Sequence, residues 1–356
     1  MYLKEELERR GVPALLKFED GREVTADNWE ERRLELVDIL SREEYGYMPD
    51  EKFKVSAAEA AKPARDCAGK AVTERLTLTV SGSKGDFSFP LLICTPAKKP
   101  GSKCPLVLLI NFRPDFPDKY LPAEEIIDRG VGVAMIYYND IALDKNEWES
   151  GIAGIYPRPE YSWSKITMWA WAASRCMDYF ETRNDIDFER IGVAGHSRLG
   201  KTALWCGAND TRFKYVFANN SGCSGDAITR CKRGETVEII YRAFPFWFVP
   251  KYNEYAGREQ DMPFDQHFVV AASAPRVVVC GAAEEDIWAD PESQYLSCCA
   301  ASQAWELLGE KGLIGVDRYP EPGDIFTKGK LGFFMRPHAH YFSRYDWNRY
   351  LDRLLI

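Results

Sequence analysis

The amino-acid sequence predicts an α/β fold with a mostly parallel central sheet, and three observations support this prediction. Short runs rich in valine, isoleucine and leucine recur along the chain. Most of these runs lack a polar residue at every second position. Segments with apolar residues at helical spacing lie between them. Strands that are apolar on both faces and alternate with helices are typical of a parallel sheet covered on both sides.

The order of these segments defines the predicted elements. Strands are predicted at 90–95, 105–111, 131–138, 190–194, 214–218 and 275–281. Helices are predicted at 28–47, 163–182, 200–207 and 292–308, and the first of them is amphipathic.

Two further segments lack a regular period. The stretch 60–66 is rich in proline, alanine and lysine, and we predict a loop there. The stretch 236–265 is rich in aromatic residues and proline, and we predict an insertion over one end of the sheet. Because ligands of open α/β sheets bind at the carboxyl ends of the strands, this insertion is expected to shape a pocket.

Composition excludes several classes of protein. The 356 residues are 46% hydrophobic and 28% charged, which is ordinary for a folded domain and unlike a disordered or collagen-like chain. The net charge of −8 comes from 54 acidic and 46 basic residues spread along the chain, which argues against a nucleic-acid partner. We expect one domain over 1–356, with a helical extension at about 1–50.

The termini and cysteines bear on compartment and cofactors. The first ten residues carry six charges and no apolar signal-peptide core, and no run approaches a membrane span. We therefore expect a cytoplasmic protein without a membrane partner, or a secreted one if a leader was removed. The ten cysteines form no C-x-x-C motif, and most lie in apolar runs. They are expected to be buried reduced thiols, with no metal and no other cofactor.

The segment from Arg190 to Lys201 carries the strongest chemical signal. An apolar strand ends at Gly195-His-Ser197, and a helical pattern begins at once. This is the context of a nucleophile elbow, in which the turn exposes the serine Oγ and the next N–H faces an oxyanion. The second residue after the serine is Leu199, where the general pattern has glycine, and Gly200 follows it. A serine that serves only as a helix N-cap is the alternative interpretation.

A serine nucleophile needs a histidine base, and the chain has four: His196, His267, His338 and His340. His196 adjoins the serine, where elbow neighbours point apart, and His267 is expected to be a structural hydrogen-bonding residue. In α/β-hydrolases the order along the chain is serine, acid, histidine. That order favours the last two histidines, which topology alone does not separate.

The acid is expected in the loop after the strand at 275–281. Asp286 lies within that loop and is preferred, with Asp290 and Glu285 as alternates. Asp290 directly precedes Pro291, an arrangement typical of an N-cap followed by proline at the first helical position. The task of the acid is to fix the tautomer of the base and to stabilise its imidazolium form.

Together these segments resemble the glucuronoyl esterases, carbohydrate esterase family 15, especially the bacterial branch. The resemblance runs in order from about residue 30 to 353, and its Ser-Arg-x-Gly-Lys string is far more specific than a bare nucleophile elbow. Its matching segments are 195–213, 219–230, 233–238, 262–276, 284–293 and 336–347. It implies a single α/β-hydrolase domain, a three-layer sandwich with an open pocket and no metal.

The resemblance also implies roles for individual residues. Ser197 matches the family nucleophile, and Arg198 matches the arginine that stabilises the oxyanion. Lys201, Glu235 and Trp288 match positions that contact the sugar. Without the family, each of the charged residues could equally be a solvated surface group, and the tryptophan could be part of the core.

The resemblance also selects His340 over His338, because the family histidine stands six residues before an Asp-Trp pair. Some family members carry the catalytic glutamate where this chain has Asn220, and an amide cannot act as the anionic partner. The acid is therefore expected from the loop after residue 281, as Asp286 or Asp290.

The resemblance implies a serine esterase that hydrolyses esters of the (4-O-methyl-)glucuronic acid carboxyl group. Such esters occur in glucuronoxylan–lignin linkages and in their oligosaccharide fragments, so the expected partner is a small-molecule or oligosaccharide uronate ester. Two alternatives stay open. One is an acetyl (xylan) esterase or another carbohydrate carboxylesterase with the same triad, and the other is a sugar-binding relic without turnover.

Overall fold

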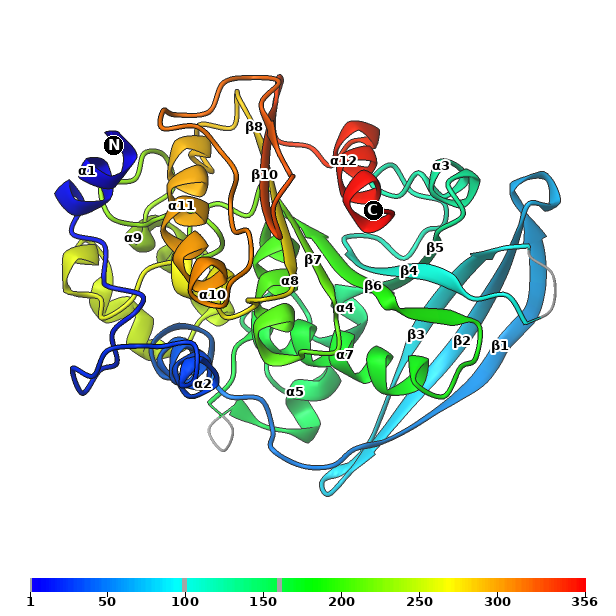
Figure 1. Ribbon diagram of the computed structural model, residues 1–356. Helices are drawn as coiled ribbons and strands as arrows, with labels where there is room; N and C mark the ends of the chain where they lie inside the picture. Colours follow the sequence, from blue (N-terminus) through cyan, green and yellow to red (C-terminus); the bar gives the residue numbers. More distant parts are fainter. Residues whose placement is uncertain (1, 98–100, 159–161) are drawn as a thin grey trace.

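The computed structural model describes residues 2–97, 101–158 and 162–356. Its centre is a ten-stranded mixed sheet with the order β1-β2-β3-β5-β4-β6-β7-β8-β10-β9 (Figure 1). The strands are β1 (Lys54–Asp66), β2 (Ala71–Gly82), β3 (Gly85–Pro96), β4 (Cys104–Asn111), β5 (Gly132–Tyr137), β6 (Ile186–His196), β7 (Tyr215–Asn219), β8 (Val277–Ala283), β9 (Ile325–Phe326) and β10 (Leu331–Arg336). Six neighbouring strands of the sheet are parallel to one another: β5, β4, β6, β7, β8 and β10. The other four, β1, β2, β3 and β9, are antiparallel to their neighbours.

Helices lie on both faces of the sheet (Figure 1). They are α1 (Tyr2–Arg9), α2 (Trp29–Leu40), α3 (Ala123–Asp128), α4 (Tyr138–Ile141), α5 (Gly151–Ile155), α7 (Lys165–Phe180), α8 (Arg198–Asn209), α9 (Val237–Ala243), α10 (His267–Ala271), α11 (Pro291–Leu307) and α12 (Arg344–Leu354). This arrangement confirms the predicted α/β-hydrolase fold with a mostly parallel sheet.

The central strands are apolar throughout because both of their faces are covered. In β4, Leu106 and Leu108 pack into the core cluster that contains α7, α8, α10 and α11. The residues between and after them, Val107 and Leu109, pack into a second cluster with α3 and α12. Successive side chains of a strand point to opposite faces, so burial on both sides requires an unbroken apolar run. The run at 105–111 therefore predicted this strand correctly.

The loop predicted at 60–66 is wrong, because this stretch forms the second half of β1. The strand lies at the edge of the sheet and pairs only with β2, with register irregularities near Ala61. An edge strand tolerates Pro63, because a backbone N–H on the outer side has no partner to lose. Most of this strand is exposed, so no apolar pattern marks it in the sequence.

The helix predicted at 28–47 corresponds to α2 and a π-helical turn, η1 (Ser41–Tyr45). The helices predicted at 163–182, 200–207 and 292–308 correspond to α7, α8 and α11. The irregular segment 236–265 contains α9 and three short 3₁₀ turns. The assignment of 1–356 to one domain with an N-terminal extension stays a prediction.

Seven of the ten cysteines are buried, Cys67 and Cys299 are half-buried, and Cys231 is exposed. Among the helices of the described ranges, none combines the length and apolar character needed to cross a bilayer.

Glu44, in the π-helical turn, is a fully buried acid. Its carboxylate accepts hydrogen bonds from Gln266 Nε2 at 3.2 and 3.3 Å. Burial raises the pKa of Glu44 from 4.5 to about 8, and the nearby Asp265 acts in the same direction. The folded protein therefore holds this proton more tightly than the unfolded chain does. The contribution of Glu44 to stability is complete below about pH 4.5 and is lost as the pH rises through 8.

We predict that Glu44→Gln flattens the pH dependence of stability, because glutamine keeps the shape and has no proton to lose. Between about pH 5 and 9 the free energy of unfolding should fall by roughly 2–4 kcal/mol less in the variant than in the wild type. Denaturant titrations at a series of pH values measure this difference. Parallel curves for the two proteins would contradict the prediction.

Candidate active site

The predicted catalytic residues gather where parallel strands end. Ser197 follows β6, Asn220 follows β7, Asp286 lies in the loop after β8, and His340 follows β10. The carboxyl ends of parallel strands share one edge of the sheet, and this edge is where open α/β sheets bind ligands. Residues that are far apart in the sequence therefore meet here because of the strand order.

Ser197 occupies a strained turn between β6 and α8. Its φ of 57° and ψ of −126° lie in a region that side-chain-bearing residues rarely adopt, at a cost of about 1–3 kcal/mol. The turn is held by a hydrogen bond from Ser197 N to Asn219 O at 2.8 Å. Within the described structure the hydroxyl makes no helix-capping hydrogen bond, so the interpretation as a simple N-cap lacks its defining contact. The serine has the geometry of a nucleophile elbow.

Two glycines permit this turn. A Cβ atom on Gly195 would lie 1.9 Å from the carbonyl oxygen of Leu199, which no side chain can occupy. At Gly200 a Cβ atom would lie 3.0 Å from Ser221 Cβ, so α8 packs tightly against the segment after β7. The departure noted in the sequence, glycine three residues after the serine, is thus the position at which the helix meets the neighbouring strand end.

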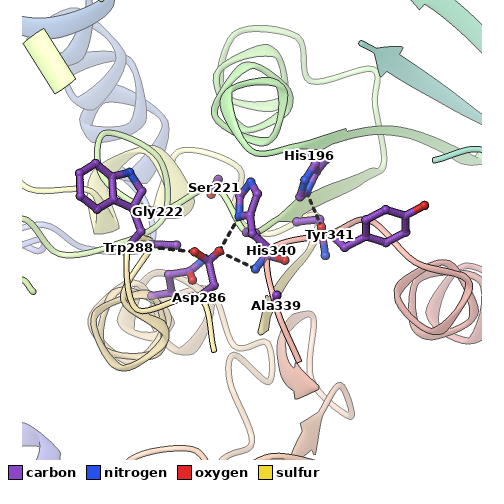
Figure 2. Close-up of polar contacts among 12 residues, drawn as sticks. His196, Ser221, Gly222, Asp286, Trp288, Ala339, His340 and Tyr341 are labelled. Carbon is purple, nitrogen blue, oxygen red and sulfur yellow. Dashed lines mark hydrogen bonds and ion pairs between the residues drawn. The ribbon is translucent and has the colours of Figure 1, made fainter. Parts of the chain in front are cut away.

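Asp286 and His340 are in direct contact. Figure 2 shows the carboxylate facing the imidazole, and His340 Nδ1 lies 2.6 Å from Asp286 Oδ2. Asp286 is 4% exposed. Burial opposes its negative charge, but hydrogen bonds from His340 and Asn220 outweigh burial and hold the pKa of Asp286 below its ordinary value of 3.8. The structure therefore places an ionised carboxylate against the predicted base.

Asn220 has a contact that the sequence did not predict. Its Nδ2 donates to Asp286 Oδ2 at 2.8 Å, the same oxygen that faces His340. The amide therefore supports the anion in the neighbouring loop in place of being an anion itself. No sequence signal could show this, because the two residues lie 66 positions apart.

The alternates lie elsewhere. The side chain of His338 is 83% exposed, and its Nδ1 lies 3.8 Å from Glu285. Asp290 is buried and caps α11, accepting from Ser293 Oγ at 2.6 Å and from Ser293 N at 3.4 Å. The predicted capping role of Asp290 is confirmed. The assignment of Ser197, His340 and Asp286 to catalytic roles stays a prediction.

The other two histidines are buried. The ring of His196 lies 4.5 Å from that of His340, centroid to centroid, and its Nδ1 lies 2.7 Å from Asn219 Oδ1. Burial and the neighbouring His340 lower the pKa of His196 to about 3, so this ring is neutral beside the base. His267 has a structural contact, with Nε2 3.0 Å from Pro13 O.

A cavity of about 490 Å³ opens at this strand edge. It is lined by every residue that the sequence assigned to catalysis or sugar contact, apart from the alternate acids Asp290 and Glu285. Its lining is Ser197, Arg198, Lys201, Asn220, Ser221, Gly222, Glu235, Ile239, Ala243, Phe244, Trp247, Asp286, Trp288, Ala289 and His340. The insertion 236–265 supplies one wall, as its position in the sequence led us to expect.

Of the three residues predicted to contact the sugar, two are buried and one is half-exposed. Lys201 and Glu235 are 4% and 8% exposed, so neither is a solvated surface charge. Lys201 Nζ donates to Ser221 O at 2.5 Å. Trp288 is 55% exposed at the rim, which makes the interpretation as a core residue wrong. A half-exposed indole beside buried polar groups suits the apolar face of a sugar ring.

Arg198 lies beside the serine with two partners that the sequence did not suggest. Its Nη1 donates to Asp144 Oδ2, and its guanidinium lies 4.5 Å from the ring centroid of Trp247. A guanidinium in this place can stabilise the negative charge that develops on a substrate oxygen. Within the described ranges, no cluster of three or more His, Cys, Asp or Glu side chains is arranged to hold a metal ion.

Comparisons with known proteins find relatives over most of the chain. The family model for glucuronyl esterase of fungi matches residues 76–309. A promiscuous CE15 esterase from a marine bacterial metagenome is 33% identical, with a TM-score of 0.88 and 96% of each chain covered. The glucuronoyl esterase of Solibacter usitatus is 32% identical, with a TM-score of 0.88 and 97% of each chain covered. The 4-O-methyl-glucuronoyl methylesterase 1 of Wolfiporia cocos is 28% identical over 84% of this chain and 72% of its own.

Proposed function

This chain belongs to the glucuronoyl esterase family, carbohydrate esterase family 15, and we propose that Ser197, His340 and Asp286 hydrolyse the ester of a glucuronic acid carboxyl group. The protein is accordingly a carboxylic ester hydrolase. The observation that carries the proposed triad is the 2.6 Å contact between His340 and Asp286, in a cavity that both share with the serine.

The proposed reaction has two halves. His340 takes the proton of Ser197 as Oγ attacks the ester carbonyl, and Asp286 stabilises the resulting imidazolium. The tetrahedral oxyanion is met by backbone N–H groups at the start of α8 and by the guanidinium of Arg198. The carbonyl re-forms, the alcohol leaves with the proton of His340, and water then hydrolyses the acyl-enzyme by the same steps.

Three residues support a sugar acid as the acyl group. Lys201 and Glu235 offer a buried donor and a buried acceptor to ring hydroxyls, and Trp288 offers an aromatic face at the rim. The fungal methylesterase named above is a relative with this substrate chemistry in its name. We propose a 4-O-methyl-glucuronate ester as the substrate, either as a small molecule or at the end of an oligosaccharide.

The test is a side-by-side assay of methyl 4-O-methyl-glucuronate and an acetylated xylose or xylo-oligosaccharide. Because the acyl group enters the cavity, we expect kcat/KM for the uronate ester to exceed that for the acetyl ester by about 100-fold or more. The reverse preference would favour an acetyl esterase. Turnover of neither ester by the folded protein would favour the sugar-binding relic.

A further inference from the structure

Asp144 lies behind the arginine that is expected to meet the oxyanion. It follows α4 at the carboxyl end of β5, and its side chain is 10% exposed. Its backbone N–H donates to Asn139 Oδ1 at 2.8 Å, which anchors the loop. Asp144 is absent from the cavity lining, whereas Arg198 belongs to it. The carboxylate is therefore placed to act through Arg198 and not on a substrate directly.

Three donors converge on this carboxylate. Arg198 Nη1 and the hydroxyl of Tyr138, the latter at 3.1 Å, donate to Oδ2. Trp247 Nε1 donates to Oδ1 at 2.6 Å. A largely buried carboxylate is costly without such donors, and each charge-assisted bond also restrains its donor. Asp144 thus connects α8, the helix that begins after Ser197, to the insertion 236–265.

Aromatic rings hold the other side of the arginine. The guanidinium lies 4.5 Å from the ring centroid of Trp247 and 5.3 Å from that of Phe244. These two rings stack on each other at 3.9 Å with an interplanar angle of 5°. Cation–π contact with a tryptophan face is attractive, and it is stronger where water is excluded. Arg198 is therefore restrained at one edge by an anion and on one face by a ring.

We propose that Asp144 is a positioning residue that holds the Arg198 guanidinium against Trp247, ready for the oxyanion. The proposal rests on the role proposed above for Arg198. A free arginine side chain samples many rotamers. Without a partner to hold it, the conformational entropy lost on fixing one rotamer would add to the activation free energy of the reaction. A donor fixed in advance stabilises the transition state without that reorganisation.

A carboxylate beside Arg198 also has an opposing effect. The negative charge of Asp144 reduces the positive potential at the oxyanion. If this electrostatic effect were the larger one, removal of the carboxylate would raise turnover. The pair is only partly buried, which weakens the charge effect, whereas the geometric restraint does not depend on screening. The positioning effect is therefore expected to be the larger one. On removal of the carboxylate, a fall in kcat indicates the positioning effect and a rise indicates the charge effect.

The first experiment compares Asp144→Asn with Asp140→Asn in the uronate methyl ester assay. Asp140 lies in α4, close in sequence and outside the cavity lining, so it is a matched control. We expect Asp144→Asn to lower kcat by roughly 10–100-fold with KM changed by less than about threefold, because the restraint matters in the transition state. Asp140→Asn should retain wild-type kinetics. An unchanged or raised kcat in Asp144→Asn would overturn the proposal.

The second experiment asks whether Asp144 acts through Arg198. In the Arg198→Met background, adding Asp144→Asn should change kcat by less than about threefold, because no guanidinium remains to position. The same 10–100-fold loss in both backgrounds would show a general structural role and overturn the proposal. If the wild type is active and only the Asp144 predictions fail, the proposed function stands. If the wild type lacks turnover of the uronate ester, the proposed function itself fails.

Chemical rescue provides a measurement that does not require the Asp144 variant to fold. In Arg198→Ala the carboxylate of Asp144 and the face of Trp247 remain. Guanidinium ion at non-denaturing concentrations should therefore restore part of kcat saturably, and uncharged urea should not. Absence of rescue by guanidinium, or equal rescue by urea, would overturn the proposal.

Discussion

Replacing Ser197 with alanine is expected to lower kcat/KM for the uronate methyl ester by roughly 10³-fold or more while the fold is retained. The reason is that the acyl-enzyme route needs the Oγ atom, and no neighbouring group replaces it. The Ser197 hydroxyl makes no capping hydrogen bond, so its loss removes no structural contact of that kind. Steady-state kinetics on purified protein measure the effect, and circular dichroism checks the fold.

Ser273→Ala is a suitable control for this experiment. Ser273 is fully buried, and its Oγ has no hydrogen-bond partner within the described structure. Its replacement removes a hydroxyl from the core without touching the cavity lining. Wild-type turnover is expected. Retained turnover in a folded Ser197→Ala protein would refute the assignment of the nucleophile.

Replacing Asp286 with asparagine is expected to lower kcat by about 10³- to 10⁴-fold. The amide would still fill the space beside His340 and accept one hydrogen bond. It would no longer stabilise the imidazolium, and it could present its NH₂ group to the ring and favour the wrong tautomer. The effect should fall mainly on kcat, because the acid acts on the base and not on the bound sugar.

Asp290→Asn is the matched comparison. Asp290 is also buried and lies in the same loop, but it caps α11 and accepts from the backbone N–H of Arg233 at 2.9 Å. Because asparagine also caps helices well, the expected loss is at most about 1 kcal/mol of stability, with turnover nearly unchanged. If Asp290→Asn abolished turnover and Asp286→Asn did not, the two assignments would have to be exchanged. If neither variant slowed the enzyme, a reaction without an acid partner would be favoured.

Parts of this site could be predicted because they depend on residues close together in the sequence. The strand, serine and helix around 190–201 form one continuous signal, and the Asp-Pro pair at Asp290 and Pro291 identified the cap. This reasoning directed attention to Asp286, which the structure places against His340. The choice of His340 over His338 needed the family resemblance, because both follow the same strand and the order along the chain treats them alike.

Other parts could not be predicted because they depend on contacts between distant residues. Asp144 and Arg198 are 54 positions apart, and Asn220 and Asp286 are 66 apart. Neither pair has a spacing or composition that marks it. The exposed half of β1 was mispredicted for a related reason, since an edge strand is stabilised by its partner strand and carries no apolar pattern of its own.

The parallel sheet and the elbow at Ser197 could be predicted from the sequence alone, because continuous apolar runs and a strand–turn–helix signal are local properties of the chain. Which side chains meet at the open edge of that sheet depends on the packing of segments that are distant in the sequence. The strand order places the ends of β5, β6, β7, β8 and β10 at one edge, and the loops between them set each side chain's direction. The contacts of Asp144 with Arg198 and of Asn220 with Asp286 therefore exist only in the folded protein.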